Sequence, residues 1–227
     1  MYLASRILGV SCSSVRRFCF PFRMALPVNI QIQIGSFQVK EFASFTLSQS
    51  LFEHHHFSLS MPYDRIEGTK GTFLSKAHQE LCGQRCTITL IPTLSESGAG
   101  KLEFQGVVTQ LEVGNQGDLT GTVQVHGYSP TYLLDQAPVR RTFHKQTLLT
   151  IFKQVLGTYG GDMPSLQAAP RYTAPLLYVA QYDESDFTFL HRLAAQYGEW
   201  FYYDGKSLHL GKPSTEALPF VSDGVRA

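Results

Sequence analysis

The chain has 227 residues, of which 43% are hydrophobic, and its formal net charge at pH 7 is +1. This length and composition indicate a folded protein with one large or two modest domains, without the basic surface that nucleic acids bind. No apolar run approaches the roughly 20 residues that a membrane-spanning helix needs.

The first 23 residues contain four arginines, several serines and no acidic residue, a composition that resembles a targeting peptide. The pattern changes at Met24, after which apolar residues at 28, 30, 32 and 34 alternate with polar ones, as in a half-buried strand. We favour Met24 as the true start over a targeting peptide. Residues 1–23 are then a leader or a mis-called start that belongs to no domain.

Short strands separated by turn residues follow at 29–34, 38–47, 56–61, 86–91, 101–114 and 119–128. This spacing predicts an antiparallel barrel or sandwich. Within 101–114 the apolar positions change from even to odd numbers at Gly106, which predicts a β-bulge at that glycine. The turn residues near 114–118 predict a hairpin between the last two strands.

Two helices interrupt the strands, and a weaker third is expected near 72–81. The first helix has a core-facing side and is expected to stop at Gly160 and Gly161; that side comprises Leu148, Ile151, Phe152, Val155, Leu156 and Tyr159. The second lies in QYDESDFTFLHRLAAQYGEWFYYDG, residues 181–205, where Phe187, Leu190, Ala194 and Tyr197 share one face. Gly198 then stands at the position of a left-handed C-cap, and 200–203 alternates as a strand into a turn at 204–205.

Three carboxylates, Asp183, Glu184 and Asp186, fall at or just before the first turn of this helix. Carboxylates there accept hydrogen bonds from free backbone N–H groups and complement the helix dipole. If Asp183 is the N-cap, Tyr182 and Phe187 occupy the two positions of a hydrophobic staple. We therefore interpret the acidic cluster as helix capping.

The alternative interpretation is enzymatic. A carbohydrate-acting hydrolase would need Asp183 and Asp186 to face each other across a substrate, or carboxylates and His191 to converge on a metal. Neighbours at one helix end rarely do so. We expect no enzyme, no catalytic residue and no cofactor.

Histidine and cysteine clusters were weighed as metal sites. Consecutive strand residues point to opposite faces, so at most two of His54, His55 and His56 can share one ion, and solvated histidines are the favoured interpretation. His78, Cys82 and Cys86 are spaced by four, but Gly83 ends the expected helix and no fourth ligand is evident. The four cysteines are too few for a disulfide scaffold and fit a reducing compartment.

Several strings, among them FQGVVTQLEV, GYSPTYLLD and RRTFHKQTLLTIFKQVL, resemble the amino-terminal hub portion of VgrG, the spike protein family of type VI secretion systems. That portion is similar to the baseplate hub of contractile phage tails. The resemblance runs from about Met24 to Gly205, and EHHHFSLSMP is nearest to the Bacteroidetes branch. Its most specific part is a helix-cap and family string that comprises Gln181, Tyr182, Asp183, Glu184, Ser185, Asp186, Phe187, Phe189, Arg192, Leu193 and Gly198.

The resemblance implies an α+β, mainly β fold like that of phage tail hubs. It places an antiparallel β-barrel domain at 24–140, an α+β segment with two helices and a hairpin at 141–205, and the truncated start of the next hub segment at 206–227. Three chains would form a hollow hub on the hexameric Hcp tube, in contact with spike-tip proteins, baseplate proteins and effectors. The function would be mechanical. The hub would assemble in the bacterial cytoplasm, and the contractile apparatus would then secrete or inject it without a signal peptide.

The family's later hub segment, small barrel and trimeric β-helix have no counterpart in this sequence, which therefore resembles a truncated fragment. Without the β-helix clamp, we expect residues 24–227 to be monomeric or loosely associating, with an unpaired strand edge at 207–210. A contractile phage hub is the nearest alternative function. The hydrolase is the alternative from another class.

Overall fold

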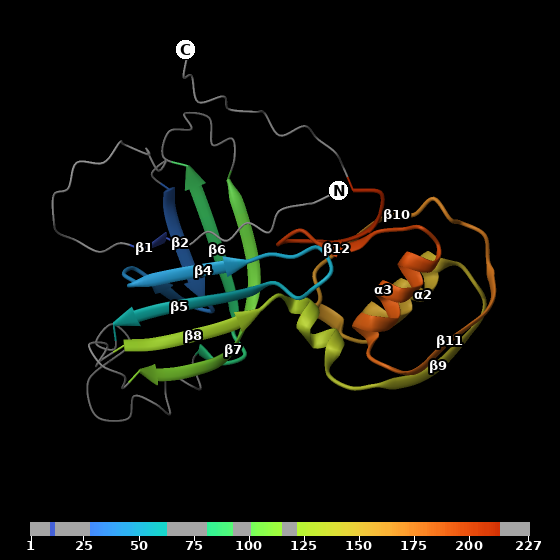
Figure 1. Cartoon of the computed structure of the whole chain (residues 1–227), viewed down its shortest axis with the longest axis horizontal. Coiled ribbons are helices and arrows are strands. Elements are labelled where there is room, and N and C mark those ends of the chain that lie inside the picture. Colours follow the sequence, from blue (N-terminus) through green and yellow to red (C-terminus); the bar gives the residue numbers. More distant parts are fainter. Residues whose placement is uncertain (1–9, 12–27, 63–80, 93–100, 115–121, 214–227) are drawn as a thin grey trace, which may run out of the picture.

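The computed structural model describes residues 10–11, 28–62, 81–92, 101–114 and 122–213. Figure 1 shows two parts, a strongly curved sheet and a smaller part that contains both labelled α-helices. The chain passes from the first to the second through a short 3-10 helix at Pro130–Asp135. No helix among the described residues is long and apolar enough to cross a bilayer.

The large sheet has eight strands in the order β1-β4-β5-β8-β7-β6-β2-β3, and every neighbouring pair is antiparallel. Its strands are β1 (Val10–Ser11), β2 (Val28–Ile34), β3 (Phe37–Val39), β4 (Ser44–Ser48), β5 (His56–Pro62), β6 (Arg85–Pro92), β7 (Leu102–Gly114) and β8 (Thr122–Tyr128). Alternate residues such as Ile32, Ile88 and Val125 are almost fully buried, as period-two patterning requires. The predicted mainly β class and the β7–β8 pairing are confirmed.

The strand predicted at 38–47 is in fact two strands, β3 and β4, which lie towards opposite ends of the sheet order. Only a short connection joins Val39 to Ser44, and an extended chain of that length spans about 17 Å. The sheet must therefore curl until its two ends approach, as the curvature in Figure 1 illustrates. No strand pair in the described part of the chain closes it into a barrel.

The bulge predicted at Gly106 lies further along β7. Pairing with β6 continues through Gly106, and the register against β8 shifts between Val108 and Gln110. Gly106 is needed for a different reason. A Cβ at this position would lie 2.8 Å from the ring of Phe57, so only glycine leaves room for that core ring.

The second part contains β9 (Val139–Gln146), α2 (Leu148–Gly157), β10 (Leu166–Ala169), β11 (Leu176–Glu184), α3 (Asp186–Gln196), β12 (Phe201–Tyr203) and β13 (Leu208–Gly211). Strands β9 and β11 form an antiparallel two-stranded ribbon, and β10, β13 and β12 form a three-stranded sheet. Helix α2 buries five of the six residues of the predicted side but ends at Gly157, before Tyr159 and before the expected stop at Gly160 and Gly161. A 3-10 turn at Gly160–Asp162 follows it. The helix expected near 72–81 lies outside the described residues apart from Leu81.

One expectation about the end of the fold is wrong. Strand β13 has no unpaired edge: it pairs in parallel with β10 and antiparallel with β12, and so carries the second part beyond residue 205. The four-residue β10 was missed because a strand so short has little periodicity. Val10 and Ser11 pair with β4 as β1, so these two residues of the supposed leader lie against the sheet.

The β12–β13 turn fastens the second part to the large sheet. The amide of Gln105 on β7 donates to the carbonyl of Gly205 at 2.7 Å. The hydroxyl of Tyr203 donates to the carbonyls of Gln105 at 2.8 Å and Gly205 at 2.6 Å. These bonds pair an irregular turn with a strand and fix the junction.

Candidate interaction surface

Residues 181–193, which belong to the most specific part of the family resemblance, cover the end of β11 and most of α3. At the centre of this string lies Asp186, which is 1% exposed. One nitrogen of Arg141 on β9 donates to both carboxylate oxygens, at 2.5 and 2.6 Å. Tyr159 donates its hydroxyl at 2.8 Å, and Gln181 its side-chain amide at 2.7 Å. Burial and the bond to Asp186 raise the pKa of Tyr159, so its proton stays in place. The network ties both ribbon strands to α3 and to the segment after α2.

Helix α3 is not capped by the carboxylates. The N-cap is Ser185, whose hydroxyl accepts a hydrogen bond from the amide of Thr188 at 3.2 Å. Asp183 belongs to β11, has a φ of +56° and faces Arg140 at 3.5 Å. Because β11 runs on to Glu184, the helix cannot begin earlier, and Tyr182, 72% exposed, forms no staple.

Glu184 holds the ribbon to the outer side of α3. It accepts two hydrogen bonds from Arg192, at 3.0 and 2.5 Å, and Arg192 also donates to the carbonyl of Ala180. The hydrogen bonds to Glu184 raise the pKa of Arg192 above its usual value. The three carboxylates of the string thus have three different roles, none of which is capping.

The apolar side of α3 differs in part from the prediction. Its buried residues are Asp186, Phe189, Leu190, Leu193 and Ala194, while Phe187 and Tyr197 are half-buried at the margin. The predicted C-cap is confirmed: Gly198 has a φ of +68°, and Glu199 donates its amide to the carbonyl of Ala194 at 2.9 Å.

The β9–β11 ribbon exposes several large apolar side chains, of which Tyr178 and Tyr182 alternate with the buried Val179 and Gln181 and so lie on its outer side. Leu177 is 79% exposed, Tyr178 59% and Tyr182 72%. Arg140 lies 5.0 Å from the centroid of the Tyr182 ring, and His144 packs edge-on against Tyr178. We call Leu177, Tyr178, Tyr182, Arg140 and His144 the ribbon face.

The ribbon face has the composition of a protein interface, where aromatic residues and arginine are enriched. Neither β9 nor β11 has a second partner strand among the described strands, so both edges of the ribbon also offer backbone groups. The hydrogen bonds of Asp186 hold this ribbon on α3. The ribbon face is therefore the candidate site.

The three consecutive histidines are not solvated, contrary to the prediction. His55 is 3% exposed and bonds to the carbonyl of Ser50 at 3.0 Å, and the ring of His54 lies 4.0 Å from that of Phe187. The loop before β5 folds onto α3, and this burial lowers the pKa of both rings. His56 is half-buried with its ring 5.9 Å from that of His126.

No group of three or more potential metal ligands occurs in the part of the chain that the structure describes. Cys86 is buried, which raises the pKa of its thiol to about 12, and Cys82 is half-buried. His78 lies outside the described residues.

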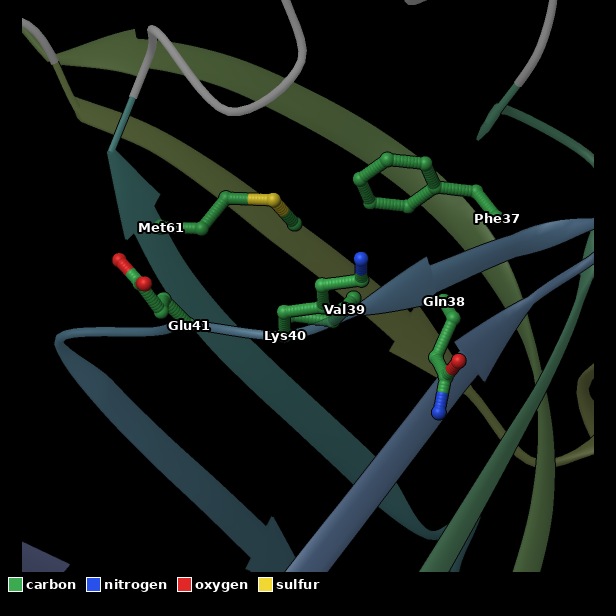
Figure 2. A pocket seen from close by; sticks show the side chains of 6 residues that line it. All are labelled: Phe37, Gln38, Val39, Lys40, Glu41 and Met61. Carbon is green, nitrogen blue, oxygen red and sulfur yellow. The ribbon is translucent and has the colours of Figure 1, made fainter.

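The geometry also gives no support to a hydrolase. Asp186 is buried on the inner side of the ribbon, whereas the side chain of Asp183 is 57% exposed on the outer side. The two carboxylates therefore share no cleft. A pocket of about 280 Å³ elsewhere, at the end of β3, includes the core residues Val39 and Met61 (Figure 2). It opens the sheet core to its edge and contains none of the predicted site residues.

Sequence reasoning missed the partners of Asp186 and the exposed apolar residues of the ribbon. Arg141 and Phe143 lie two apart on β9, so strand alternation places Arg141 on the buried side, where an arginine needs a counter-charge. That signal could have been found. Leu177 and Tyr178 gave none, because an apolar pair in a strand reads equally well as core.

Residues 71–221 match the family described as phage tail baseplate hub (GPD). The chain belongs to this family. The match includes strands β6, β7 and β8 of the large sheet and all of the second part, with the Asp186 network and the ribbon face. No curated protein matches the sequence.

Solved structures share the hub fold at low sequence identity. The 43 kDa tail protein of prophage MuSo2 from Shewanella oneidensis has a TM-score of 0.63 and 20% identity over 83% of this chain and 54% of its own. A type VI secretion component of E. coli has a TM-score of 0.53 and 16% identity over 83% and 47%. VgrG in the Francisella PdpA–VgrG complex has a TM-score of 0.50 and 13% identity over 81% and 31%. The chain thus spans about half or less of these proteins, and the likeness shows a shared fold.

Proposed function

We propose that the chain is a structural part of a type VI secretion spike, the hub that caps the Hcp tube and carries the puncturing tip. The observation that carries the proposal is the baseplate hub family match over residues 71–221. The VgrG-like string 181–193 and the solved VgrG-like structures of the same fold support the type VI assignment. The protein works as a mechanical scaffold and not as an enzyme.

In this proposal the curled eight-stranded sheet is the barrel domain of the hub, and the second part is its α+β segment. Three copies surround a common axis, and the ribbon face of each copy contacts the surface of another protein. The further partners are the Hcp tube, spike-tip and baseplate proteins, and delivered effectors. The hub assembles in the bacterial cytoplasm and leaves with the contractile apparatus.

A contractile phage baseplate hub is the second candidate. The prophage tail protein has a TM-score of 0.63, compared with 0.53 and 0.50 for the two secretion proteins. Fold likeness at such low identity cannot separate two machines that share one hub architecture. The tube protein that the hub binds separates them.

Co-sedimentation tests this choice. The purified chain is mixed with preassembled rings of Hcp or of phage tail-tube protein encoded in the same genome. We expect it to sediment with Hcp rings alone. Sedimentation with tail-tube rings alone would establish the phage function instead, and sedimentation with neither would remove tube capping from the proposal.

A further inference from the structure

A second exposed apolar surface lies on α3, beside the loop that precedes β5. It is a groove of about 430 Å³ whose walls include Phe52, Phe187, His191 and Phe201. Phe52 is 59% exposed and its ring stacks on that of Trp200, with 5.8 Å between the ring centroids. We call this groove, with Phe52 and Trp200 at its rim, the groove face.

The groove face and the ribbon face lie on opposite sides of α3. Phe189 faces the ribbon, where its ring stacks on Phe143 at 5.7 Å, whereas Phe187, His191 and Ala195 line the groove. Since successive helical residues are about 100° apart, positions 187 and 189 point in nearly opposite directions. The two faces of one copy therefore point away from each other and cannot cover each other.

The groove wall contains Arg192, whose charge is offset by its pair with Glu184, and acidic side chains lie beside the groove. Glu53 is exposed next to Phe52, and Asp135, 43% exposed, lies 3.5 Å from His54. Burial lowers the pKa of His54 and His191, so neither ring offsets these acids at neutral pH. The ribbon carries Arg140, 65% exposed, and the exposed Lys145. Arg140 lies over the ring of Tyr182 and pairs with the exposed Asp183, an ion pair that water screens and a partner can replace.

We propose that the ribbon face of one copy docks on the groove face of the next, so that copies join head to tail. The apolar residues of the ribbon would fill the groove, with Arg140 and Lys145 beside Glu53 and Asp135. A contact between two different faces repeats from copy to copy and closes into a ring when the rotation allows. The inference rests on the proposed assembly function and names the two surfaces that make the contact.

Photo-crosslinking tests the pairing. Tyr182 is replaced by p-benzoylphenylalanine, a photoreactive residue of similar shape, and ¹⁴N-labelled and ¹⁵N-labelled chains are mixed so that crosslinks between copies are recognised by mass. We expect mixed-isotope crosslinks from residue 182 to the peptide around Phe52 or to 187–201. Mixed-isotope crosslinks to 176–184 would show a symmetric ribbon-to-ribbon contact and overturn the proposal.

Mixing two variants gives an independent readout. Tyr182→Ser with Leu177→Ser disables the ribbon face, and Ala195→Arg blocks the groove from an exposed helix position. Each variant alone should be monomeric by light scattering, and their mixture should form dimers but nothing larger. Monomers in the mixture, where the unaltered chain associates, would overturn the pairing.

The two proposals fail in different ways. Association with crosslinks elsewhere would overturn the pairing alone, because the hub would still assemble. A chain that binds tube rings but shows no crosslink between copies at any concentration would also overturn only the pairing. A chain that neither associates nor binds tube rings would overturn both.

Discussion

At the scale of single residues, the carboxylate of Asp186 is buried inside the protein, where four hydrogen bonds from three side chains replace the water around it. Asp183 lies three residues away but faces solvent, so the same chemical group has a different energetic role. The local sequence does not distinguish the two residues. Only their surroundings in the folded chain do.

We expect Asp186→Asn to lower the free energy of unfolding by about 3 kcal/mol, near the low end of the cost of breaking a buried ion pair. Arg141, whose side chain is 23% exposed, would lose its counter-charge. The matched control is Asp183→Asn, whose exposed pair with Arg140 is worth about 0–1 kcal/mol. Urea denaturation measures both, and equal small losses would contradict the structural role of the network. A peptidoglycan-hydrolysing activity that disappears in a folded Asp186→Asn variant would overturn the scaffold function.

His191 makes the folded state sensitive to acid. Burial, and next the neighbouring His54, lower its pKa from 6.5 to about 4, so the unfolded chain takes up the proton first as pH falls. Stability from this residue is fully present above pH 6.5 and is lost between about 6.5 and 4. We expect the Tm to fall from pH 7 to pH 5, and to fall less in His191→Gln. His144→Gln, at an exposed histidine, should keep the full dependence; an unchanged slope in His191→Gln would exclude this residue as the cause.

At the scale of elements, the β12–β13 turn decides how the second part sits on the sheet. Gly205 has a φ of +108°, and a Cβ there would lie 2.9 Å from the carbonyl oxygen of Glu103. The approach lets the Gly205 carbonyl reach the amide of Gln105. A tight turn therefore acts as a joint between the two parts.

We expect Gly205→Ala to destabilise the protein more than Gly160→Ala. Both glycines have positive φ, but a Cβ at Gly160 meets nothing within 4 Å. The control introduces left-handed backbone strain of about 1 kcal/mol without a clash, whereas Gly205→Ala adds both the clash and a φ outside the left-handed helical region. Hydrogen exchange at the Gln105 amide should quicken only in Gly205→Ala, and equal behaviour of the two variants would show that the turn does not fasten the junction.

At the scale of the whole molecule, the proposed function requires copies of the chain to meet one another. Strand β13 is paired on both sides and offers no free edge for such a contact. The ribbon face and the groove face are the surfaces that we propose for it. Each face presents only a few large side chains. Contacts made by the remaining length of the related proteins would add effective concentration to such interfaces.

We expect the 227-residue chain to associate weakly, with a mean mass that rises with concentration in the micromolar range. Size exclusion with light scattering measures it across a dilution series. Tyr182→Ser should keep the mass at that of a monomer. A discrete trimer that persists on dilution would show that these faces need no further contacts.

The sequence alone determined whatever depends on neighbours along the chain. Alternation placed β2, β5, β6 and β7, the spacing of Leu148 to Leu156 placed the buried side of α2, and Gly198 marked the end of α3. The string 181–193 indicated the hub family. These features were predictable because period, capping and turn chemistry are set within a few residues.

Only the tertiary structure decided which distant groups meet. Asp186 became a buried ion-pair residue because β9 brings Arg141 beside it, 45 positions away in sequence. Residues 208–211 became a central strand because β10, about 40 residues earlier, pairs with them. The stretch 38–47 broke into two strands because the sheet curls and needs its connection there, and Tyr182 faces solvent because α3 already covers the other side of the ribbon. Strand pairing and burial depend on long-range contacts, and a local pattern of apolar residues does not specify which partner covers them.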